Sequence, residues 1–276
     1  MVLEFTKMQG CGNDYMYVDC LAAPFEDAPR AARALSPRHF AVGADGLICI
    51  CKSSVADAAM RMYNADGSEG AMCGNGVRCV AQWLYEHGLV GDTAVIETRA
   101  GCKTLTRVGE NQWRVDMGFA SFDAADVAAG GLGAGPLVGK ELMVGGRAWQ
   151  VSCVSMGNPH CVTLVPDAAA VDLKAIGPGF EHHKAFANGV NTEFVQVLAP
   201  DRLKMRVWER GSGETLACGT GACASVAACV AAGLCRPEQD VQVELLGGRL
   251  TIRVQRDWRV LMTGPAFTVF TGKAAY

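Results

Sequence analysis

The sequence has little charge and no concentration of charge of either sign. Asp, Glu, Lys and Arg make up 19% of its 276 residues, and the formal net charge is −3. No run of Lys or Arg predicts a nucleic-acid surface, and no acidic tail predicts a basic partner. No apolar stretch has the length and flanks of a membrane span; the nearest, residues 217–233, is rich in Ala, Cys and Gly and predicts a buried helix. We therefore expect neither nucleic acid nor a membrane as a partner.

The usual cofactor signatures are also missing. No Gly-x-x-x-x-Gly-Lys-Ser/Thr loop occurs, and no His/Cys cluster has a recognised zinc spacing. The two cysteine motifs described below contain no lysine that could hold pyridoxal phosphate. We therefore expect chemistry without a cofactor or a metal, acting on a small-molecule substrate.

Thirteen cysteines are present, but they do not predict a disulfide scaffold. The chain is long, the count is odd, and Met1 to Lys7 lacks the apolar core of a signal peptide. Many of the cysteines lie in apolar runs, as Cys229 does, where they behave as small buried hydrophobes. Free thiols on this scale favour a reducing compartment, so we expect the protein in the cytoplasm.

Two similar stretches place one cysteine directly before a Gly-polar-Gly run. The first is residues 64–76, with Cys73, and the second is residues 209–221, with Cys218. The two cysteines are 218 − 73 = 145 positions apart, and Asn13 and Asn158 have the same separation, 158 − 13 = 145. A constant offset between distant motifs indicates a duplicated domain. We therefore expect two pseudo-symmetric lobes with a site between them.

Each lobe reads as strands around one buried helix. Val77, Val80, Ala81 and Leu84 follow Cys73 at helical spacing, and the helix after Cys218 has no charged residue before Arg236. A helix that is apolar on every side must be enclosed. The expected fold is therefore α+β, with each lobe a β-barrel-like sheet wrapped round a central helix. We expect an N-terminal lobe over residues 1–118 and a C-terminal lobe over residues 119–264, with residues 265–276 returning to the first lobe.

The two cysteines suggest a reaction that is itself nearly symmetric. A thiol at a helix N-terminus meets unpaired N–H groups and the positive end of the helix dipole, which favour the thiolate. A nucleophilic cysteine would need only one copy of the motif. Two copies fit removal of a Cα proton from one face and its return to the other, with one thiolate and one thiol as the competent state. This is racemisation or epimerisation by two bases, with helix N–H groups stabilising the charge on an α-carboxylate.

These motifs closely resemble those of the diaminopimelate epimerase family over nearly the whole chain. The segments that carry the resemblance are residues 12–14, 64–69, 72–79, 157–162 and 209–221. The resemblance implies cofactor-independent interconversion of LL- and meso-2,6-diaminopimelate, a step of lysine and peptidoglycan-precursor synthesis. It also implies a homodimer of two-lobed subunits.

The resemblance also assigns roles to individual residues. Cys73 and Cys218 look like the acid/base pair, and His160 and Glu209 look like the groups that assist them. The expected cradle of the α-carboxylate consists of Gly74, Asn75, Gly219 and Thr220. The residues that look like binders of the substrate's polar ends are Asn13, Asn64, Asn158, Asn191, Glu209 and Arg210.

One position departs from part of the family, and two other functions stay open. Some members carry Gln where this chain has Gly46, the repeat partner of Asn191 (191 − 46 = 145). A proline or hydroxyproline racemase shares the logic of two cysteines but usually has His in place of Asn75. A non-enzymatic thiol or metal-binding module is the competing class, and it predicts bound zinc or a reversible disulfide between Cys73 and Cys218.

Overall fold

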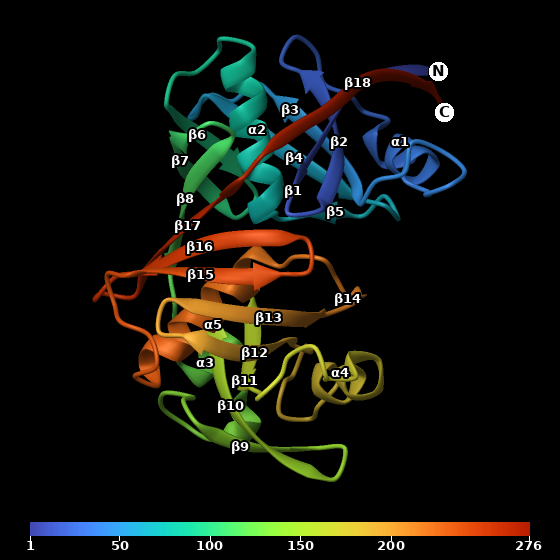
Figure 1. Cartoon of the computed structure of the whole chain (residues 1–276). Helices are drawn as coiled ribbons and strands as arrows, with labels where there is room; N and C mark the ends of the chain where they lie inside the picture. Colours follow the sequence, from blue (N-terminus) through green and yellow to red (C-terminus); the bar gives the residue numbers. More distant parts are fainter. The chain divides into compact units, whose positions relative to one another are not determined.

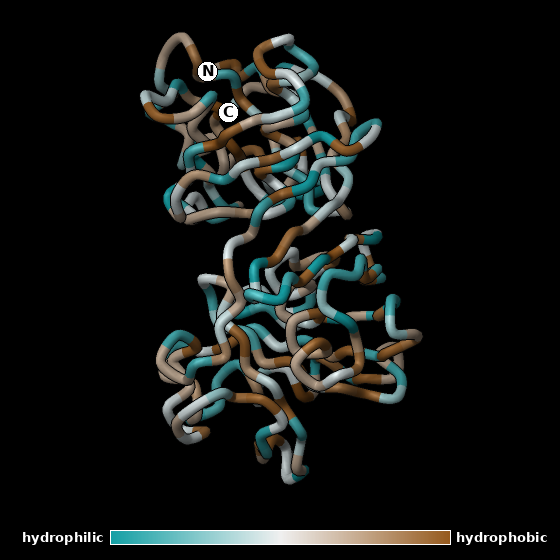
Figure 2. Tube along the Cα trace, turned by 90° about the vertical axis from the view of Figure 1, so that its left-hand side faces the viewer, coloured by the Kyte–Doolittle hydropathy of each residue, from teal (hydrophilic) through white to brown (hydrophobic).

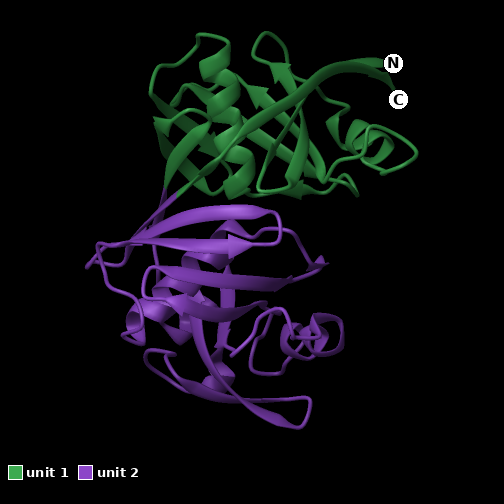
Figure 3. Cartoon of the chain, viewed as in Figure 1, with its two compact units in different colours: residues 1–115, 263–276 green, residues 116–262 purple.

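The computed structural model describes residues 1–276, which divide into two compact units. Unit 1 comprises Met1–Val115 together with Thr263–Tyr276, and unit 2 comprises Asp116–Met262 (Figure 3). Both junctions lie slightly earlier in the chain than the positions 118 and 264 suggested by the sequence. Each unit is described by itself below.

Unit 1 is a curled sheet that surrounds one long helix, α2, and carries a short helix, α1, beside it (Figure 1). Its elements are β1 (Val2–Gly10), β2 (Asn13–Cys20), α1 (Ala28–Leu35), β3 (Gly46–Cys51), β4 (Ala58–Asn64), β5 (Glu69–Gly70), α2 (Gly74–Glu86), β6 (Thr93–Thr98), β7 (Gly101–Gly109), β8 (Gln112–Phe119), which runs on into unit 2, and β18 (Phe267–Ala275).

Unit 2 repeats this arrangement around helix α5. Its elements are α3 (Ala124–Val127), the 3-10 turn η1 (Gly130–Leu132), β9 (Lys140–Val144), β10 (Arg147–Ser155), β11 (Pro159–Leu164), α4 (Leu173–Glu181), β12 (Asn191–Ala199), β13 (Arg202–Glu209), β14 (Gly213–Glu214), α5 (Gly219–Ala231), β15 (Asp240–Leu245), β16 (Gly248–Val254) and β17 (Arg259–Pro265), which runs back into unit 1.

The duplication that the sequence predicts is present in the strand pairing. In unit 1, β2 runs parallel to β3 with Tyr15 opposite Gly46. In unit 2, β11 runs parallel to β12 with His160 opposite Asn191. Both members of the second pair are shifted by 145 residues, since 160 − 15 = 191 − 46 = 145. The two halves are therefore copies in register as well as in sequence, which confirms the predicted pseudo-symmetric lobes.

The central helices are enclosed by their sheets. Residues 74–84 of α2 are all buried, and Val77, Val80 and Ala81 have no exposed surface. Helix α5 packs against β10–β13 and β16, and its residues 221–229 are buried throughout. A helix apolar on every side needs this enclosure, as the sequence predicts. None of the helices combines the length and the apolar character needed to span a membrane.

The strands alternate between hydrophobic and hydrophilic residues, as expected for a sheet with one buried face. Figure 2 shows this alternation as short brown and teal segments along the trace of each unit. Strand β8 is an example, because Trp113, Val115 and Met117 are buried while the residues between them are partly exposed. The buried faces cover the central helices and so hold the first turn of each helix in a fixed place.

Three local features bound these elements. Helix α1 ends at Leu35, two residues before Pro37, which has no backbone N–H to continue the helical hydrogen bonds. Strand β9 begins at Lys140, which follows Gly139 at φ 62°. Residues 124–135 contain the short helix α3 and the turn η1. The tail from Phe267 forms β18, which pairs antiparallel with β1 in unit 1.

Candidate active site

Cys73 is the N-cap residue of α2 in unit 1. Its extended backbone (φ −130°, ψ 120°) turns the side chain back over the first helical turn, where Sγ accepts a hydrogen bond from Gly76 N at 3.3 Å. Sγ also donates to Oδ1 of Asn13 at 3.1 Å. Cap residues normally satisfy an unpaired N–H with an oxygen, and here a sulfur takes that place. The thiol therefore lies within the positive field of the helix N-terminus, as the sequence predicts.

The second glycine of each Gly-polar-Gly run permits a close approach between helix and strand. A Cβ at Gly76 would lie 2.8 Å from Cδ1 of Ile48 on β3. A Cβ at Gly221 would lie 2.6 Å from Oε1 of Glu193 on β12. Ile48 and Glu193 are themselves repeat partners, since 193 − 48 = 145. The repeated glycines therefore let the first turn of each helix pack directly on the same strand of its sheet.

Asn13 is held by a network of charged side chains in unit 1. Its Nδ2 donates to Oδ2 of Asp45 at 2.7 Å, and the same oxygen accepts from the backbone N of Asp14 at 3.1 Å. Arg38 bridges the two carboxylates, and Lys7 lies 2.7 Å from Asp14. Burial alone would raise the pKa of the Asp14 carboxyl, but its hydrogen bonds from Arg38 and Lys7 lower that pKa overall.

The Asn75 side chain does not point outward to a ligand but is 2% exposed and bound to Arg78. Arg78 is fully buried on α2 and donates from Nη2 to Asn75 Oδ1 at 2.9 Å, from Nη1 to Gly74 O at 3.1 Å and from Nε to Pro265 O at 3.1 Å. The cradle expected at Gly74 and Asn75 is therefore left to backbone N–H groups, which point out of the first turn of a helix.

Two further positions of unit 1, Asn64 and Gly46, lie opposite each other on β4 and β3. Asn64 ends β4, is exposed, and donates to Ser68 Oγ at 2.9 Å. Gly46 lies where a side chain cannot be added, because a Cβ there would be 2.1 Å from the carbonyl oxygen of Tyr63. Its repeat partner Asn191 has room for an amide, so the copies differ in backbone packing at this position, and the glycine is a requirement of unit 1.

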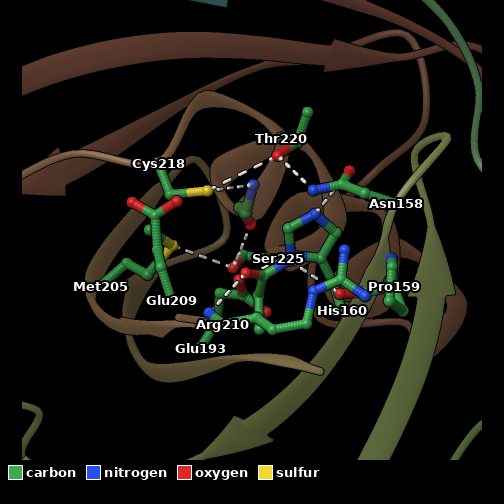
Figure 4. A network of polar contacts seen from close by, with 12 residues as sticks. Asn158, Pro159, His160, Glu193, Met205, Glu209, Arg210, Cys218, Thr220 and Ser225 are labelled. Atoms are coloured by element: carbon green, nitrogen blue, oxygen red, sulfur yellow. Dashed lines mark hydrogen bonds and ion pairs between the residues drawn. The ribbon is translucent and has the colours of Figure 1, made fainter. Parts of the chain in front are cut away.

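Cys218 is the N-cap residue of α5 in unit 2 and is 5% exposed. Its Sγ accepts from Gly221 N at 3.3 Å, the same contact that Cys73 makes with Gly76. Sγ also lies 3.5 Å from Oγ1 of Thr220, which in turn accepts from Nδ2 of Asn158 at 3.3 Å. Figure 4 shows Thr220 between the thiol and the amide. The predicted residues Cys218, Thr220 and Asn158 are thus brought together.

His160 extends this chain of contacts to a buried carboxylate that the sequence reasoning missed. His160 Nε2 lies 3.1 Å from Asn158 Oδ1, and its Nδ1 lies 2.7 Å from Oε1 of Glu193 (Figure 4). Both ring and carboxylate are completely buried. An ionised carboxylate can only accept, so the Nδ1 position of His160 carries a hydrogen. One ligand atom each from His160, Glu193 and Cys218 lie within 4.8 Å of one another.

Glu209 supplies a second carboxylate beside Cys218. It is half-buried at the end of β13, and Thr215 Oγ1 donates a short hydrogen bond to its Oε1. Burial raises the pKa of Glu209, against the opposing effects of hydrogen bonds from Thr215 and Cys218. Burial, followed by the negative charges of Glu209 and Glu193, raises the pKa of the Cys218 thiol well above its ordinary value. Each of these two groups therefore holds a proton more firmly than it would in water.

Asn191 and Arg210 lie next to each other at the ends of β12 and β13. Asn191 is buried, donates to Pro159 O at 2.9 Å and accepts from the backbone N of Arg210 at 2.9 Å. The Arg210 guanidinium is exposed and donates from Nη1 to Asn188 O at 3.0 Å. Asn191 therefore fixes the backbone from which Arg210 projects, while the guanidinium fork keeps a carboxylate-binding geometry at the surface of unit 2.

Three buried or half-buried groups around the predicted residues were not anticipated. They are Asp45 and Arg78 in unit 1 and Glu193 in unit 2. The sequence held a signal for Glu193, because its charge stands directly before the largely apolar, β-rich run of residues 194–198. Buried acids almost always have a polar partner. No comparable signal exists for Asp45, which lies in a loop, or for Arg78, which reads as part of a helix's polar stripe.

Each half-site can therefore bind an anion and exchange a proton. Helix N–H groups at Gly74 and Asn75, and at Gly219 and Thr220, suit a carboxylate. A thiol stands at the same N-terminus in each unit. Side chains on neighbouring strands control the hydrogen bonding of each thiol. This set of groups fits proton transfer at a carbon that carries a carboxylate.

Comparison with known proteins identifies the family. The sequence model of the family described as diaminopimelate epimerase matches residues 5–122 and 152–269, one segment in each half. The chain is 48% identical over 283 residues to a diaminopimelate epimerase of Agathobacter rectalis, covering 98% of this chain and 99% of that one. It is also 48% identical over 280 residues to diaminopimelate epimerase 1 of a Nostoc species, covering 99% and 100%.

Solved structures with the same architecture are more distant in sequence. A phenazine biosynthesis protein of the PhzF family from Bacillus anthracis has a TM-score of 0.75 at 19% identity and covers all of both chains. A hydroxyproline epimerase from Agrobacterium vitis has a TM-score of 0.69 at 16% identity, covering 99% of this chain and 91% of that one. These similarities support the fold, and the sequence matches over nearly the full length show that the chain belongs to the diaminopimelate epimerase family.

Proposed function

We propose that this protein interconverts LL- and meso-2,6-diaminopimelate by moving a proton at one α-carbon, without a cofactor. The observation that carries the proposal is the pair of matched half-sites. Cys73 and Cys218 each cap a buried helix, each accept an N–H from the third residue on, and each precede a Gly-polar-Gly run. Membership of the diaminopimelate epimerase family supports the choice of substrate and a place in lysine and peptidoglycan-precursor synthesis.

In the proposed mechanism the two thiols exchange roles. One cysteine, as thiolate, takes the Cα proton and becomes a thiol, and the other thiol delivers its proton to the opposite face and becomes a thiolate. The negative charge that develops on the substrate is delocalised into the α-carboxylate and stabilised by the N–H groups at the helix N-termini. The proposal requires both half-sites to address one α-carbon.

The groups around the thiols have different proposed tasks. Glu209 takes the proton of Cys218 when that thiol must act as the base, and the hydrogen bond between the two groups supports this role. His160, fixed by Glu193, orients Asn158 and through it Thr220 beside the same thiol. Arg210, Asn191 and Asn64 bind the distal ammonium and carboxylate, which a smaller amino acid lacks.

An exchange experiment tests this function directly. Metal-free protein is incubated with LL-diaminopimelate in D2O, and the product is followed by chiral chromatography and mass spectrometry. We expect meso product carrying one deuterium at the inverted carbon, with no requirement for pyridoxal phosphate. A protein that takes up no deuterium and forms no meso product would refute the proposal, whereas zinc-dependent activity would favour a metal-assisted reaction instead.

We also propose that the enzyme acts as a homodimer in the cytoplasm. The support is the family resemblance and the thirteen cysteines, which suit a reducing compartment. Sedimentation velocity at micromolar concentration tests the first part, and a single species of about 29.1 kDa, the mass of one chain, would contradict it. Fractionation of cells from the source organism tests the second.

A further inference from the structure

The two matched thiols have different hydrogen-bonding neighbours. Cys73 Sγ lies 3.1 Å from the oxygen of the Asn13 amide, which can only accept. Cys218 Sγ lies 3.5 Å from the Thr220 hydroxyl, which can donate. Because Thr220 already accepts from Asn158 Nδ2, its own hydrogen can be directed toward Cys218. An acceptor beside a thiol favours the protonated form, and a donor favours the thiolate. At Cys218 the donor acts against burial and the negative charge of Glu209, which raise the pKa of that thiol overall.

The orientation of the Asn13 amide is set by Asp45. The hydrogen-bond partners of an amide show which of its two terminal atoms is the oxygen and which is the nitrogen. For Asn13 the deciding partner is Asp45. Asp45 Oδ2 lies 2.7 Å from Asn13 Nδ2, and an ionised carboxylate can only accept. The nitrogen must therefore face Asp45, and the oxygen is left to face Cys73.

Asp45 is itself held from two other directions, so it cannot easily turn away. Its Oδ2 accepts from Asp14 N at 3.1 Å, and its Oδ1 accepts from Arg38 Nη2 at 3.0 Å. Its backbone N donates to Asp14 O at 2.8 Å. These contacts hold the Asp45 carboxylate in place independently of Asn13.

Unit 2 has no carboxylate at the position that matches Asp45. The repeat partner of Asp45 is Val190, since 190 − 45 = 145, and Val190 is fully buried and apolar. Conversely, Glu209 beside Cys218 has Asn64 as its repeat partner in unit 1 (209 − 64 = 145), which bonds to Ser68. The duplicated scaffold therefore places a carboxylate next to one thiol and an amide oxygen, fixed by a more distant carboxylate, next to the other.

We propose that Asp45 is a positioning residue that locks the Asn13 amide with its oxygen toward Cys73, and that this orientation stabilises the protonated form of the Cys73 thiol. The inference rests on the proposed two-thiol function for its catalytic meaning, but the state of Cys73 can be measured without turnover.

Other groups near Cys73 act on it as well and must stay constant in the test. Tyr17 on β2 and Cys79 on α2 interact electrostatically with Cys73, and Arg78 carries a buried positive charge five positions further along the chain, on the same helix. Around Asp45, the charged groups are Lys7 on β1, Asp14 on β2 and Arg38 in the loop after α1. None of these side chains is changed in the variants proposed below.

The test is the pH dependence of Cys73 alkylation in the full-length protein. Iodoacetamide labelling is quenched at intervals, and the labelled peptides that contain Cys73 and Cys218 are quantified by mass spectrometry. In Asp45→Ala the Asn13 amide can rotate and donate to the thiolate. We expect Cys73 to react about tenfold faster at pH 7.5, which corresponds to about one unit in the midpoint. The Cys218 peptide in the same digest is the internal control and should not change.

Loss of the Asp45 charge would also favour the thiolate directly, so a double-mutant cycle separates the two causes. If Asp45 acts through the amide, Asp45→Ala should accelerate labelling in the parent but change it less than about twofold in the Asn13→Ala background. A direct charge effect would be the same in both backgrounds. Equal acceleration in the two backgrounds, or no acceleration in a folded Asp45→Ala protein, would overturn the proposal.

A conservative variant guards against a general loss of structure. In Asp45→Asn the new amide oxygen can still accept from Asn13 Nδ2, so labelling of Cys73 should stay within about threefold of the parent. If Asp45→Asn and Asp45→Ala behave alike although both melt as the parent does, the orienting role is refuted. Absence of epimerase activity in the parent would refute the proposed function but leave this measurement interpretable.

Discussion

His160 Nδ1 lies 2.7 Å from Oε1 of Glu193, and neither side chain has any exposed surface. The second oxygen of Glu193, Oε2, makes no hydrogen bond within the protein and is also buried. A buried carboxylate with one unsatisfied oxygen destabilises a fold. Such a group suggests a role that outweighs its cost, and the contacts assign that role to the orientation of His160 and, through Asn158 and Thr220, of Cys218.

Glu193→Gln tests this role with little change in shape. The amide can accept a hydrogen bond from His160 but no longer carries charge, so the ring can adopt other tautomers and orientations. We expect kcat to fall by at least about tenfold, within the range that a positioned acid/base group contributes, while KM changes little. Steady-state kinetics with LL-diaminopimelate over a pH series provides the measurement.

The control for Glu193→Gln is Glu97→Gln in unit 1. Glu97 also lies in a strand and accepts a hydrogen bond from a serine, Ser53, at 2.5 Å, but it is remote from the proposed chemistry. The Glu97→Gln substitution should leave kcat near the parent value. Glu193→Gln with parental kcat and an unchanged pH profile would show that the buried carboxylate serves only packing.

The two thiols should be individually essential for turnover. Cys73→Ala and Cys218→Ala are expected to abolish epimerisation, and the Ser variants to leave little, because a hydroxyl is a far weaker base than a thiolate near neutral pH. Cys102→Ala, at an exposed position on β7, and Cys229→Ala, buried in α5, should keep full kcat. Substantial turnover by either Cys73→Ala or Cys218→Ala would refute the two-base mechanism.

The sequence was sufficient for the plan of the fold because duplication leaves a signal at many positions. The shared offset of 145 predicts two similar lobes, and the apolar helices after Cys73 and Cys218 predict their enclosure. The boundaries of single elements were less accessible, as at Leu35, where α1 ends two residues before Pro37. The tail has no repeat partner, which suggested that it returns to the first lobe. Its pairing as β18 with β1 is a long-range contact that the local sequence does not show.

In the proposed site, too, some residues could be predicted from the sequence and others could not. Residues that repeat, such as Asn13 with Asn158, could be found by offset, whereas residues that make the halves different could not. Glu193 stands where unit 1 has Ile48, and Asp45 stands where unit 2 has Val190. A comparison of the halves finds only what they share. The difference between the hydrogen-bond partners of the two thiols depends on contacts between strands and loops that a sequence does not show.

Stability at alkaline pH should depend on the buried thiols. Burial raises the pKa of Cys79 to about 12 from an ordinary value of 9.0. Because the folded-state pKa is raised, the contribution of Cys79 to stability is complete below pH 9 and is lost as pH rises toward 12. For this one group the free energy of unfolding should fall by about 1.4 kcal/mol per pH unit in that window.

Chemical denaturation at pH 8 to 11, under reducing conditions, checks this behaviour. Cys79→Ala should be somewhat less stable at pH 8, because a buried sulfur is lost, but its stability should fall less steeply with pH than that of the parent. Cys102→Ala is the matched control, because Cys102 is exposed and should not alter the slope. Parallel curves for Cys79→Ala and the parent would contradict the assignment.

Arg78 is expected to support both the fold of unit 1 and the carboxylate cradle. Arg78→Met keeps much of the side-chain volume but leaves Pro265 O, Gly74 O and Asn75 Oδ1 without this donor. Each buried unsatisfied acceptor costs about 1–3 kcal/mol, so the free energy of unfolding should fall by several kcal/mol. Arg61→Met, which removes an exposed ion pair with Glu69, should cost about 1 kcal/mol or less. Urea titrations of the two variants make the comparison, and equal losses would refute the role of Arg78.

The last prediction concerns the choice of substrate. A simple racemase needs the α-carboxylate, the ammonium and two thiols, yet unit 2 also presents Arg210, whose backbone N is held by Asn191. The Arg210 guanidinium donates to Asn188 O from Nη1, which orients the fork without neutralising its charge. A carboxylate is the natural partner of such a fork. We therefore expect Arg210 to bind the distal carboxylate of diaminopimelate.

Lysine provides the sharpest comparison, because it lacks only that carboxylate. A site built for a polar group rejects an analogue that lacks it, by roughly 10⁴-fold in favourable cases, since its own polar groups are left unpaired. The parent should therefore use LL-diaminopimelate far better than L-lysine. Arg210→Met should lose about 100-fold in kcat/KM for diaminopimelate, the effect of a charge-assisted pair worth about 3 kcal/mol, and should change the slow reaction of lysine little. Parallel losses for both substrates would mean that Arg210 shapes the loop before Cys218, and similar kcat/KM values for the two substrates in the parent would favour a general amino acid racemase.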